Sequence, residues 1–379
     1  MLLEFGARNF LSFDEGFEAS LRLNQQCPEN ISKGKEFSNI LCVKGGNASG
    51  KSNVLKTTSF IADFCKNSFN YKPDEEINLF SFFNNNKPSE FFVVFKINDI
   101  EYRYELEIIR KQVISEIVYR KKIRYQKVFE RKNNQIVFAT KEFNYLEKIK
   151  IRKNASIIST AHQYEVNCIE AIYNFFTIII TNVKIFGLTE IGQNISKVSK
   201  LYKDNESLFE FVIDIIKKCD MGIKTIEIFE REEEGGKTHY FPIFTHELKE
   251  SLEKLTYFSQ SSGTRALYRI LALYKIVLNI GGVLVLDEFD INLHPHILPI
   301  LVELFENDDT NKNNSQIIFT THNTSIIDKL GKYRTLFVNK ENSSSYTYRL
   351  DELPGDIVRN DRPISPIYNS GKIGGVPRV

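Results

Sequence analysis

The stretch Gly45-Gly46-Asn47-Ala48-Ser49-Gly50-Lys51-Ser52 decides the fold of this chain, because it matches the pattern GxxxxGK[ST]. An apolar strand is predicted just before it, at residues 40–43, and a helix just after it, from Lys51 to about Phe69. Small residues in such a loop let successive backbone N–H groups surround phosphates, and the helix N-terminus adds partial positive charge. A glycine-rich turn that only happens to precede a lysine lacks this context. The stretch therefore predicts a P-loop within an α/β fold.

The P-loop pattern assigns a task to each polar group around a bound nucleotide. Lys51 is expected to reach the β- and γ-phosphates, and the Ser52 hydroxyl is expected to ligate Mg²⁺. The expected cofactors are therefore ATP and Mg²⁺. The other residues expected to contact ATP are Gly45, Gly46, Asn47, Ala48, Ser49, Gly50 and Asn53.

A P-loop needs an acidic partner, and two later strands supply polar residues at their ends. The wholly apolar strand Val283–Leu286 runs into Asp287 and Glu288, as a Walker B strand does. Asp287 is expected to hold the metal, and Glu288 to orient or deprotonate the attacking water. His322 follows another apolar strand, predicted at 316–321, and can hydrogen-bond the γ-phosphate and the water. A solvated acidic turn and a structural histidine are the simpler interpretations of each feature taken alone.

A second serine- and glycine-rich turn, Ser261-Ser262-Gly263-Thr264, stands at the start of a helix predicted over 264–279. A helix N-terminus of this composition can bind an anion. One chain does not need two anion sites for one triphosphate, whereas two chains that enclose ATP between them do. The four residues are therefore interpreted as a signature motif that acts on ATP bound by another subunit. A serine N-cap is the alternative interpretation.

Composition and charge exclude several classes of protein. The formal net charge is only +2, so no global field favours nucleic acid or a membrane surface. The five cysteines form no CxxC pair, which argues for a reducing compartment and against structural zinc. No signal peptide is recognised at the N-terminus, and the most apolar run, residues 173–180, is too short to span a bilayer. A cytoplasmic protein without membrane partners is expected.

The segment between the two Walker motifs is expected to change character along its length. Alternating residues predict β-hairpins over 90–137, with a turn at Asn98-Asp99. The pattern turns helical at about 145–219, and short strands are predicted at 224–229 and 239–244. The whole segment is too long for a minimal P-loop core and lacks the heptads of a coiled coil.

Basic residues outnumber acidic ones between Arg103 and Lys132, on the predicted hairpins. A solvated face is the simpler interpretation of such a run. The functional interpretation is a surface for nucleic acid or for an acidic protein.

The order of these motifs resembles a known group. NFLSF near the N-terminus, GGNASGKS, QSSGT, VLVLDEFD and TTHN resemble the ABC-type ATPase heads of the SMC/RecF/OLD group. DEFDINLHP, Asp220-Met221-Gly222-Ile223 and the closing Tyr368-x-x-Gly371-Lys372-x-Gly374-Gly375-Val376-Pro377 are similar to the AAA-type ATP-binding proteins of bacterial phage-defence and abortive-infection loci. One departure is that no glutamine can be assigned to a Q-loop.

The resemblance implies a P-loop ABC-type ATPase head with an antiparallel β-layer and a helical insertion arm. We expect residues 1–139 to form an N-terminal ATPase lobe with the P-loop and the β-hairpins. Residues 140–222 are expected to form the helical arm, and residues 223–379 a C-terminal lobe with the signature, Walker B and the switch histidine.

The function implied is an ATP-hydrolysing switch that dimerises or assembles further around ATP and controls a separate effector, such as a nuclease, in anti-phage defence. The alternative is a RecF/SMC-like repair ATPase that acts directly on DNA. A self-contained OLD-type nuclease is disfavoured, because the sequence after His322 offers no room for a TOPRIM domain.

Overall fold

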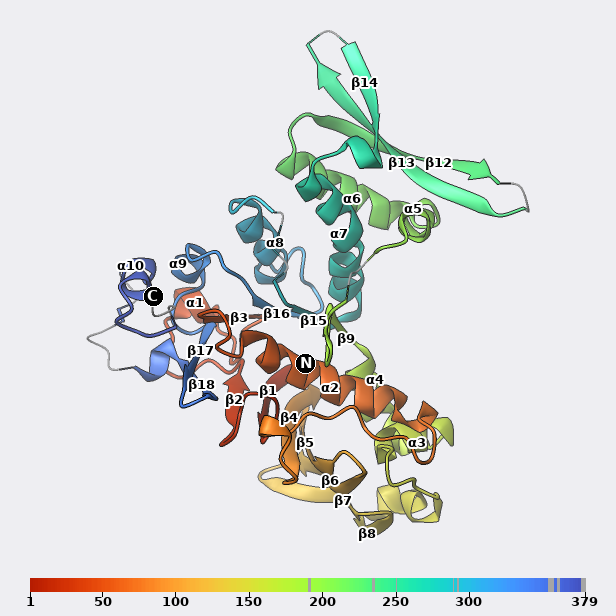
Figure 1. Cartoon of the computed structure of the whole chain (residues 1–379), viewed down its shortest axis with the longest axis vertical. Helices are drawn as coiled ribbons and strands as arrows, with labels where there is room; N and C mark the ends of the chain where they lie inside the picture. The colour runs from red at the N-terminus through yellow and green to blue at the C-terminus, as the bar shows by residue number, and fades with distance from the viewer. Residues whose placement is uncertain are drawn as a thin grey trace.

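A computed structural model of the chain describes residues 1–189, 192–233, 236–249, 251–288, 290–291, 293–353, 358–359 and 362–375. Two large sheets enclose one long helix, and a smaller sheet projects from the opposite side of the core (Figure 1). The enclosed helix is α2 (Lys51–Asn67), which begins within the predicted P-loop and contacts strands of both large sheets.

The six-stranded sheet carries the strands that lead into the candidate motifs. Its order is β18 (Ser344–Arg349), β17 (Thr335–Glu341), β3 (Ile40–Gly45), β16 (Gln316–Thr320), β15 (Val283–Leu286) and β9 (Ile179–Thr181). All pairings are parallel except that of the edge strand β18. Strands β15 and β16 are buried throughout, which explains the wholly apolar sequence of β15 and the apolar centre of β16.

The predicted hairpins form strands β4 to β8 and join the N-terminal strands β1 and β2 in a seven-stranded antiparallel sheet. Its order is β2 (Phe17–Ser20), β1 (Leu2–Arg8), β4 (Ser89–Ile97), β5 (Ile100–Ile109), β6 (Gln112–Lys121), β7 (Tyr125–Lys132) and β8 (Gln135–Ala139). Asn98 and Asp99 both adopt positive φ, as a tight type I′ hairpin turn requires. The turn predicted between β4 and β5 is therefore confirmed.

Helices cover the sheets and divide the apolar core in two. One cluster surrounds α2 between the two large sheets, and the other lies on the far face of the six-stranded sheet. No helix within the described residues is both long and apolar enough to cross a membrane. The remaining helices are α1 (Glu29–Ser32), α3 (Ile157–Gln163), α4 (Glu170–Thr177), α5 (Ile195–Lys203), α6 (Glu206–Cys219), α7 (Ser262–Ile280), α8 (Ile297–Glu306), α9 (Ile326–Leu330) and α10 (Ser365–Asn369).

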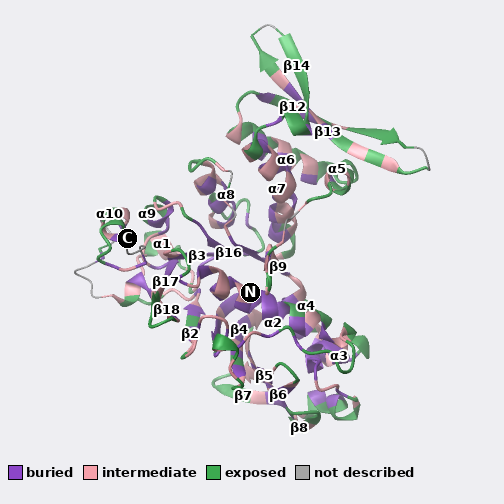
Figure 2. Ribbon diagram, in the orientation of Figure 1, coloured by how far each residue is buried: buried purple, intermediate pink, exposed green. Residues whose placement is uncertain are grey.

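A three-stranded antiparallel sheet projects from the core beside α5, α6 and the start of α7 (Figure 1). It consists of β12 (Ile223–Glu232), β13 (Thr238–Leu248) and β14 (Ser251–Thr256). Ile226 and Phe244 are buried in the same apolar cluster as residues of α6 and α7, whereas most of the sheet is exposed (Figure 2). A two-residue ladder, β10 (Val183–Lys184) with β11 (Gly187–Leu188), completes the strands.

Six strands were not predicted from the sequence. Strand β9 lies inside the stretch that was predicted to be helical, and it pairs in parallel with β15 at the edge of the core sheet. That prediction is wrong there, because a short apolar run fits a buried helix and a buried strand equally well. The others are β10, β11, β14, β17 and β18. The division of the chain at residues 139 and 222 stays a prediction.

A buried ion pair fastens the seven-stranded sheet to the start of α3. Arg131 on β7 and Glu116 on β6 have fully buried side chains, and Nη1 of Arg131 lies 3.1 Å from Oε2 of Glu116. The Glu116 carboxylate also accepts hydrogen bonds from Tyr104 Oη, Ser156 Oγ and the Ile157 backbone N–H, at 3.0, 2.5 and 3.0 Å. Arg131 therefore belongs to the interior and not to a basic surface.

We expect Glu116→Gln to lower the free energy of unfolding by about 3–5 kcal/mol, because it leaves the Arg131 charge buried and uncompensated. Urea denaturation measures the change. The matched control is Glu90→Gln, since Glu90 pairs with Arg8 at 3.7 Å while both side chains stay more than half exposed. The control should change stability by no more than about 1 kcal/mol. Equal effects of the two variants would contradict the interpretation.

Candidate functional site

The P-loop lies where β3 passes into α2, and two of its glycines, Gly45 and Gly50, stand at positions that tolerate no side chain. A Cβ on Gly45 would lie 2.3 Å from the Val338 carbonyl oxygen. Gly50 adopts φ +112°, and a Cβ there would lie 2.7 Å from Ser345 Oγ. Ala48 also has positive φ. The loop is therefore shaped by its backbone, as a phosphate-binding loop requires.

Lys51 is the first residue of α2, and its ammonium group turns back into the loop. Its side chain is buried, and Nζ donates a hydrogen bond to the Gly46 carbonyl oxygen at 2.9 Å. Burial lowers the pKa of Lys51, and the nearby Glu288 and Asp287 carboxylates oppose that shift. The lysine thus faces both acids predicted from the Walker B strand, although they lie far away in sequence.

Other polar groups complete the loop. Ser49 Oγ is buried and has no hydrogen-bond partner among the described residues, so it remains free for a ligand. Asn53, on the first turn of α2, donates from Nδ2 to Ser12 Oγ at 2.8 Å, which ties the NFLSF turn to the helix. Asn47 and Ser52 occupy the loop and the helix start, as the motif places them. The predicted nucleotide-binding residues are therefore adjacent in space.

A threonine from the neighbouring strand fixes the Walker B acids. Asp287 is buried at the end of β15, and its Oδ1 accepts a hydrogen bond from Thr320 Oγ1 at 2.6 Å. The same Thr320 hydroxyl oxygen accepts from the Glu288 backbone N–H at 2.8 Å. Thr320 ends β16, the strand between β15 and β3. One hydroxyl thus holds both residues at the carboxyl edge of the sheet.

Asn182 is a site residue that the sequence interpretation missed. It follows β9, and its side-chain amide bonds the Asp287 backbone twice, accepting from N at 2.7 Å and donating to O at 2.9 Å. The signal that could have found it is a polar residue at the end of an apolar run, the same signal that identified Asp287. The segment was predicted to be helical, so its end was not sought there.

Glu288 and His322 lie close together beyond the ends of β15 and β16. Their Oε1 and Nε2 atoms are 3.6 Å apart, and the two side chains are 33% and 52% exposed. Glu288 adopts φ +47°, an uncommon backbone conformation for a glutamate. The Glu288 carboxylate and the His322 imidazole both reach solvent beside the P-loop, where they can orient a water molecule.

The residues present fit Mg²⁺ as well as a triphosphate. The Ser52 hydroxyl and the Asp287 carboxylate are hard oxygen donors, the type that Mg²⁺ prefers. Backbone N–H groups and Lys51 provide the positive environment that phosphates need. Ser52 and Asp287 would therefore hold the ion, while the loop and Lys51 would hold the phosphates.

The candidate signature residues are not brought to the P-loop of the same chain. Ser261 is the N-cap of α7, where its Oγ accepts from the Thr264 backbone N–H at 3.1 Å, and Thr264 Oγ1 donates to Asp220 Oδ2 at 3.0 Å. Ser261 and Ser262 are exposed, and Gly263 is partly exposed. Figure 1 shows the start of α7 beside the projecting sheet, well away from the start of α2. Ser261 therefore does cap its helix, and the turn also presents a free surface.

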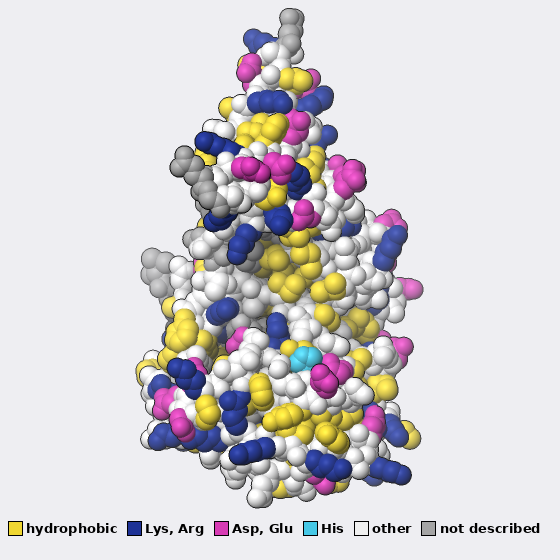
Figure 3. Space-filling view, turned by 90° about the vertical axis from the view of Figure 1, so that its right-hand side faces the viewer, with side chains coloured by type: hydrophobic (Ala, Val, Ile, Leu, Met, Phe, Trp, Pro, Cys, Tyr) yellow, Lys and Arg dark blue, Asp and Glu magenta, His cyan; other side chains and the backbone are white. Residues whose placement is uncertain are grey.

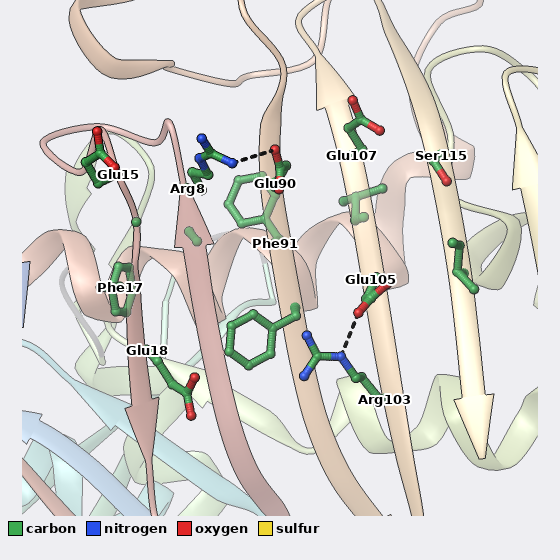
Figure 4. Close-up of a pocket in the computed structure, with 15 residues that line it drawn as sticks. Arg8, Glu15, Phe17, Glu18, Glu90, Phe91, Arg103, Glu105, Glu107 and Ser115 are labelled. Carbon is green, nitrogen blue, oxygen red and sulfur yellow. Dashed lines mark hydrogen bonds and ion pairs between the residues drawn. The ribbon is translucent and has the colours of Figure 1, made fainter. Parts of the chain in front are cut away.

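The hairpins that looked basic in the sequence have a mixed surface. A cavity of about 670 Å³ opens on the face of the seven-stranded sheet, and its charged lining is mostly acidic (Figure 4). Arg103 lies in it, 2.6 Å from Glu105. Figure 3 likewise shows cationic and anionic side chains interspersed on one side of the molecule. This favours the solvated interpretation of the basic run. The charged residues that line the cavity are Arg8, Glu15, Glu18, Glu90, Arg103, Glu105 and Glu107.

This geometry defines an ABC-type P-loop ATPase head. A comparison with protein families matches residues 40–328 to the family described as "AAA domain, putative AbiEii toxin, Type IV TA system". The match covers more than half of the chain, and the chain belongs to this family.

A solved structure supports the same fold. The structure titled "Crystal structure of the SmcHead bound to the C-winged helix domain of ScpA" is 13% identical in sequence with a TM-score of 0.51, covering 92% of this chain and 97% of that one. A comparison with curated proteins finds no match. The predicted ABC-type, SMC-like fold is therefore confirmed.

We expect Lys51→Ala to weaken ATP binding about 100-fold, because it removes charge-assisted hydrogen bonds to the phosphates. Glu288→Gln should leave the affinity almost unchanged and lower kcat by about 10²- to 10⁴-fold, because the phosphate contacts stay and the base is lost. Calorimetry and a phosphate-release assay measure the two effects. Lys66→Ala, on the last turn of α2, is the control. Wild-type turnover by Glu288→Gln would show that its assignment is wrong.

Proposed function

We propose that this chain binds and hydrolyses ATP, assembles around it with a second copy, and uses that state to control a separate effector protein. The observation that carries the proposal is the separation of two anion-binding features within one chain. The P-loop and the Walker B acids meet at one edge of the core sheet, whereas Ser261 stands elsewhere and faces solvent.

The chemistry follows from the residues at the P-loop. Lys51 and the loop N–H groups bind the phosphates and orient the terminal one. Mg²⁺, held by Ser52 and Asp287, would neutralise charge on the phosphate oxygens. Glu288 orients the attacking water and accepts its proton, and His322 beside it hydrogen-bonds the water or the γ-phosphate. Thr320 and Asn182 keep the Walker B segment in place.

The second copy completes the site. The turn formed by Ser261, Ser262, Gly263 and Thr264 is exposed at its two serines and buried at Thr264. It presents N–H groups at the start of a 19-residue helix, where the helix dipole favours an anion. The γ-phosphate bound by the partner's P-loop is the ligand that this turn would contact. Two such contacts, related by a two-fold axis, make a closed homodimer.

The biological role rests on the family. The family description names a toxin of a toxin–antitoxin system, and the SMC head of similar fold was solved with a partner protein domain. We place this chain in anti-phage defence, as the ATP-dependent regulator of an effector such as a nuclease. Direct action on DNA is less favoured, because arginines of the hairpin sheet such as Arg103, Arg120 and Arg131 pair with carboxylates.

Subunit mixing tests the shared site. Ser261→Arg should preserve ATP binding by the single chain but block ATP-driven dimerisation, because a bulky cation fills the space of the partner's γ-phosphate. Mixed in equal amounts with Lys51→Ala, it should regain about a quarter of wild-type ATPase activity, because half of all chance pairings join the two variants and each such pair has one intact site of two. The control mixture, Lys51→Ala with Glu288→Gln, should regain nothing. Both residues belong to the half of the site that contains the P-loop, so each site of a mixed dimer still carries one of the two changes. Full activity of Ser261→Arg at high dilution would refute the shared site.

Phage challenge tests the role. The chain, expressed together with the effector encoded by the neighbouring gene, should protect cells from phage. Lys51→Ala or Glu288→Gln should remove the protection, because both variants interrupt the ATP cycle. Plaque counts measure it, with Lys66→Ala as the control. The chain alone should neither arrest growth nor cleave DNA or RNA. Growth arrest by the chain alone would make it the toxin itself, and protection by Lys51→Ala would show that ATP is not the switch.

A further inference from the structure

A lysine in the centre of the core sheet has no task in the proposed reaction. Lys44 is the penultimate residue of β3, one position before the P-loop, and only 2% of it is exposed. A central parallel strand normally carries apolar residues at such a position. An ammonium group in this setting is unfavourable unless its N–H groups find acceptors. Its contacts therefore indicate what it holds together.

The Lys44 ammonium binds the backbone of the loop that carries His322, residues 321–325, which we call the switch loop. Nζ donates to the Thr321 carbonyl oxygen at 2.9 Å and to the Asn323 carbonyl oxygen at 3.1 Å. These two carbonyl groups belong to the residues on either side of His322. The lysine thus holds the peptide segment that carries the imidazole, without touching the imidazole itself.

The C-terminal segment covers the same ammonium group. Nζ of Lys44 lies 5.6 Å from the ring centroid of Tyr368 on α10, within the range of a cation–π contact. Two carbonyl oxygens and one aromatic face match the three N–H groups of an ammonium. The Tyr368 hydroxyl donates to the Gly375 carbonyl oxygen at 2.8 Å. Tyr368 therefore connects Lys44 to the closing glycine-rich turn.

That turn lies against the root of the P-loop. Gly375 adopts φ +73°, and a Cβ there would lie 3.6 Å from the Gly45 Cα and 3.1 Å from the Phe337 ring. The turn is also tied to β18, because the Tyr348 hydroxyl donates to the Ile373 carbonyl oxygen. Val376 and Pro377 of the closing motif lie outside the described residues. The segment 365–375 thus closes over Lys44 and Gly45 together.

Lys44 interacts electrostatically with charged residues of both the P-loop and the segment after the Walker B strand. Burial lowers the pKa of Lys44, and the neighbouring Lys51 lowers it further, while Asp290 opposes the shift. Asp290 in turn accepts a hydrogen bond from the Thr321 hydroxyl. The lysine is therefore close to the phosphate-binding residue on one side and to the switch loop on the other.

We propose that Lys44 and Tyr368 form a tether through which the C-terminal segment holds the His322 loop in register with the P-loop. They are positioning residues, and the inference rests on the proposed ATPase reaction. The tether explains how an exposed imidazole can have a defined place, since both peptide groups that flank it are fixed from inside the sheet. It also assigns a task to the closing glycine-rich turn.

Kinetic coupling to His322 tests the tether. Lys44→Met keeps the stem and removes the donors, and it should lower kcat by about 10- to 100-fold, because the imidazole loses its fixed place. The KM for ATP should change by less than about threefold, because the P-loop contacts remain. Lys44→Met combined with His322→Ala should show a loss at least about threefold smaller than the product of the single losses. An unchanged kcat, or fully multiplicative losses, would overturn the proposal.

Tyr368 provides a second, independent variant. Tyr368→Leu should lower kcat by about fivefold, because it removes the ring over Lys44. Tyr368→Phe keeps the ring and should retain more activity than Tyr368→Leu. The matched control is Lys332→Met, because Lys332 lies 5.3 Å from the ring centroid of Tyr333 and donates to the Val358 carbonyl oxygen instead of to the residues that flank His322. An equal loss in the control, or no loss in Tyr368→Leu, would contradict the tether.

Hydrogen exchange in the nucleotide-free protein separates this inference from the proposed function. Lys44→Met and Tyr368→Leu should raise the exchange rate of the amides at 321–325 and leave β15 unchanged, because only the loop is released. This readout requires no ATP turnover. Absent ATPase activity in the wild type would refute the proposed function alone. Unchanged exchange in both variants would refute the tether alone.

Discussion

The parallel pairing of β3 with β16, and of β16 with β15, is the constraint on which the rest of the site depends. In register, Val43 stands beside Thr320, and Phe319 stands beside Leu286, so three strands end at one edge. Because parallel strands end together, the P-loop, the Walker B acids and the His322 loop all emerge at this edge. A displaced strand would separate Lys51 from Asp287 and leave two unconnected motifs.

Hydrogen bonds between strand ends turn this proximity into defined geometry. Thr320 joins β16 to Asp287 and Glu288, Asn182 joins β9 to the same segment, and Lys44 joins β3 to the loop after β16. Each hydrogen bond is short and largely shielded from water. Polar groups interact more strongly in such a setting than in solvent. The acids are thus placed by neutral side chains and backbone groups, which leaves their charges available to a metal and a water molecule.

Much of the fold and part of the site could be predicted from the sequence alone. The helices at 51–67 and 262–280, the strand at 283–286 and the β-hairpin layer were recognisable, because periodicity and turn residues are local signals. Asn182, Thr320 in its bonding role, and Lys44 were not recognised. Their importance comes from partners distant in the chain, and the apolar run before Asn182 was predicted to be helical, so its end was not recognised as a strand end.

The sequence by itself determined that the chain has a P-loop and, later, an apolar strand that ends in two acids. Each motif is recognised from residues that are adjacent in the chain, at 45–52 and at 283–288. It also determined that a second serine- and glycine-rich turn precedes a long helix. Only the tertiary structure decided that Ser261 stands apart from Lys51, that β9 borders β15, and that the C-terminal segment closes over Lys44. Strand order and helix direction decide these relations, and residues far apart in the chain acquire them only when the sheet assembles.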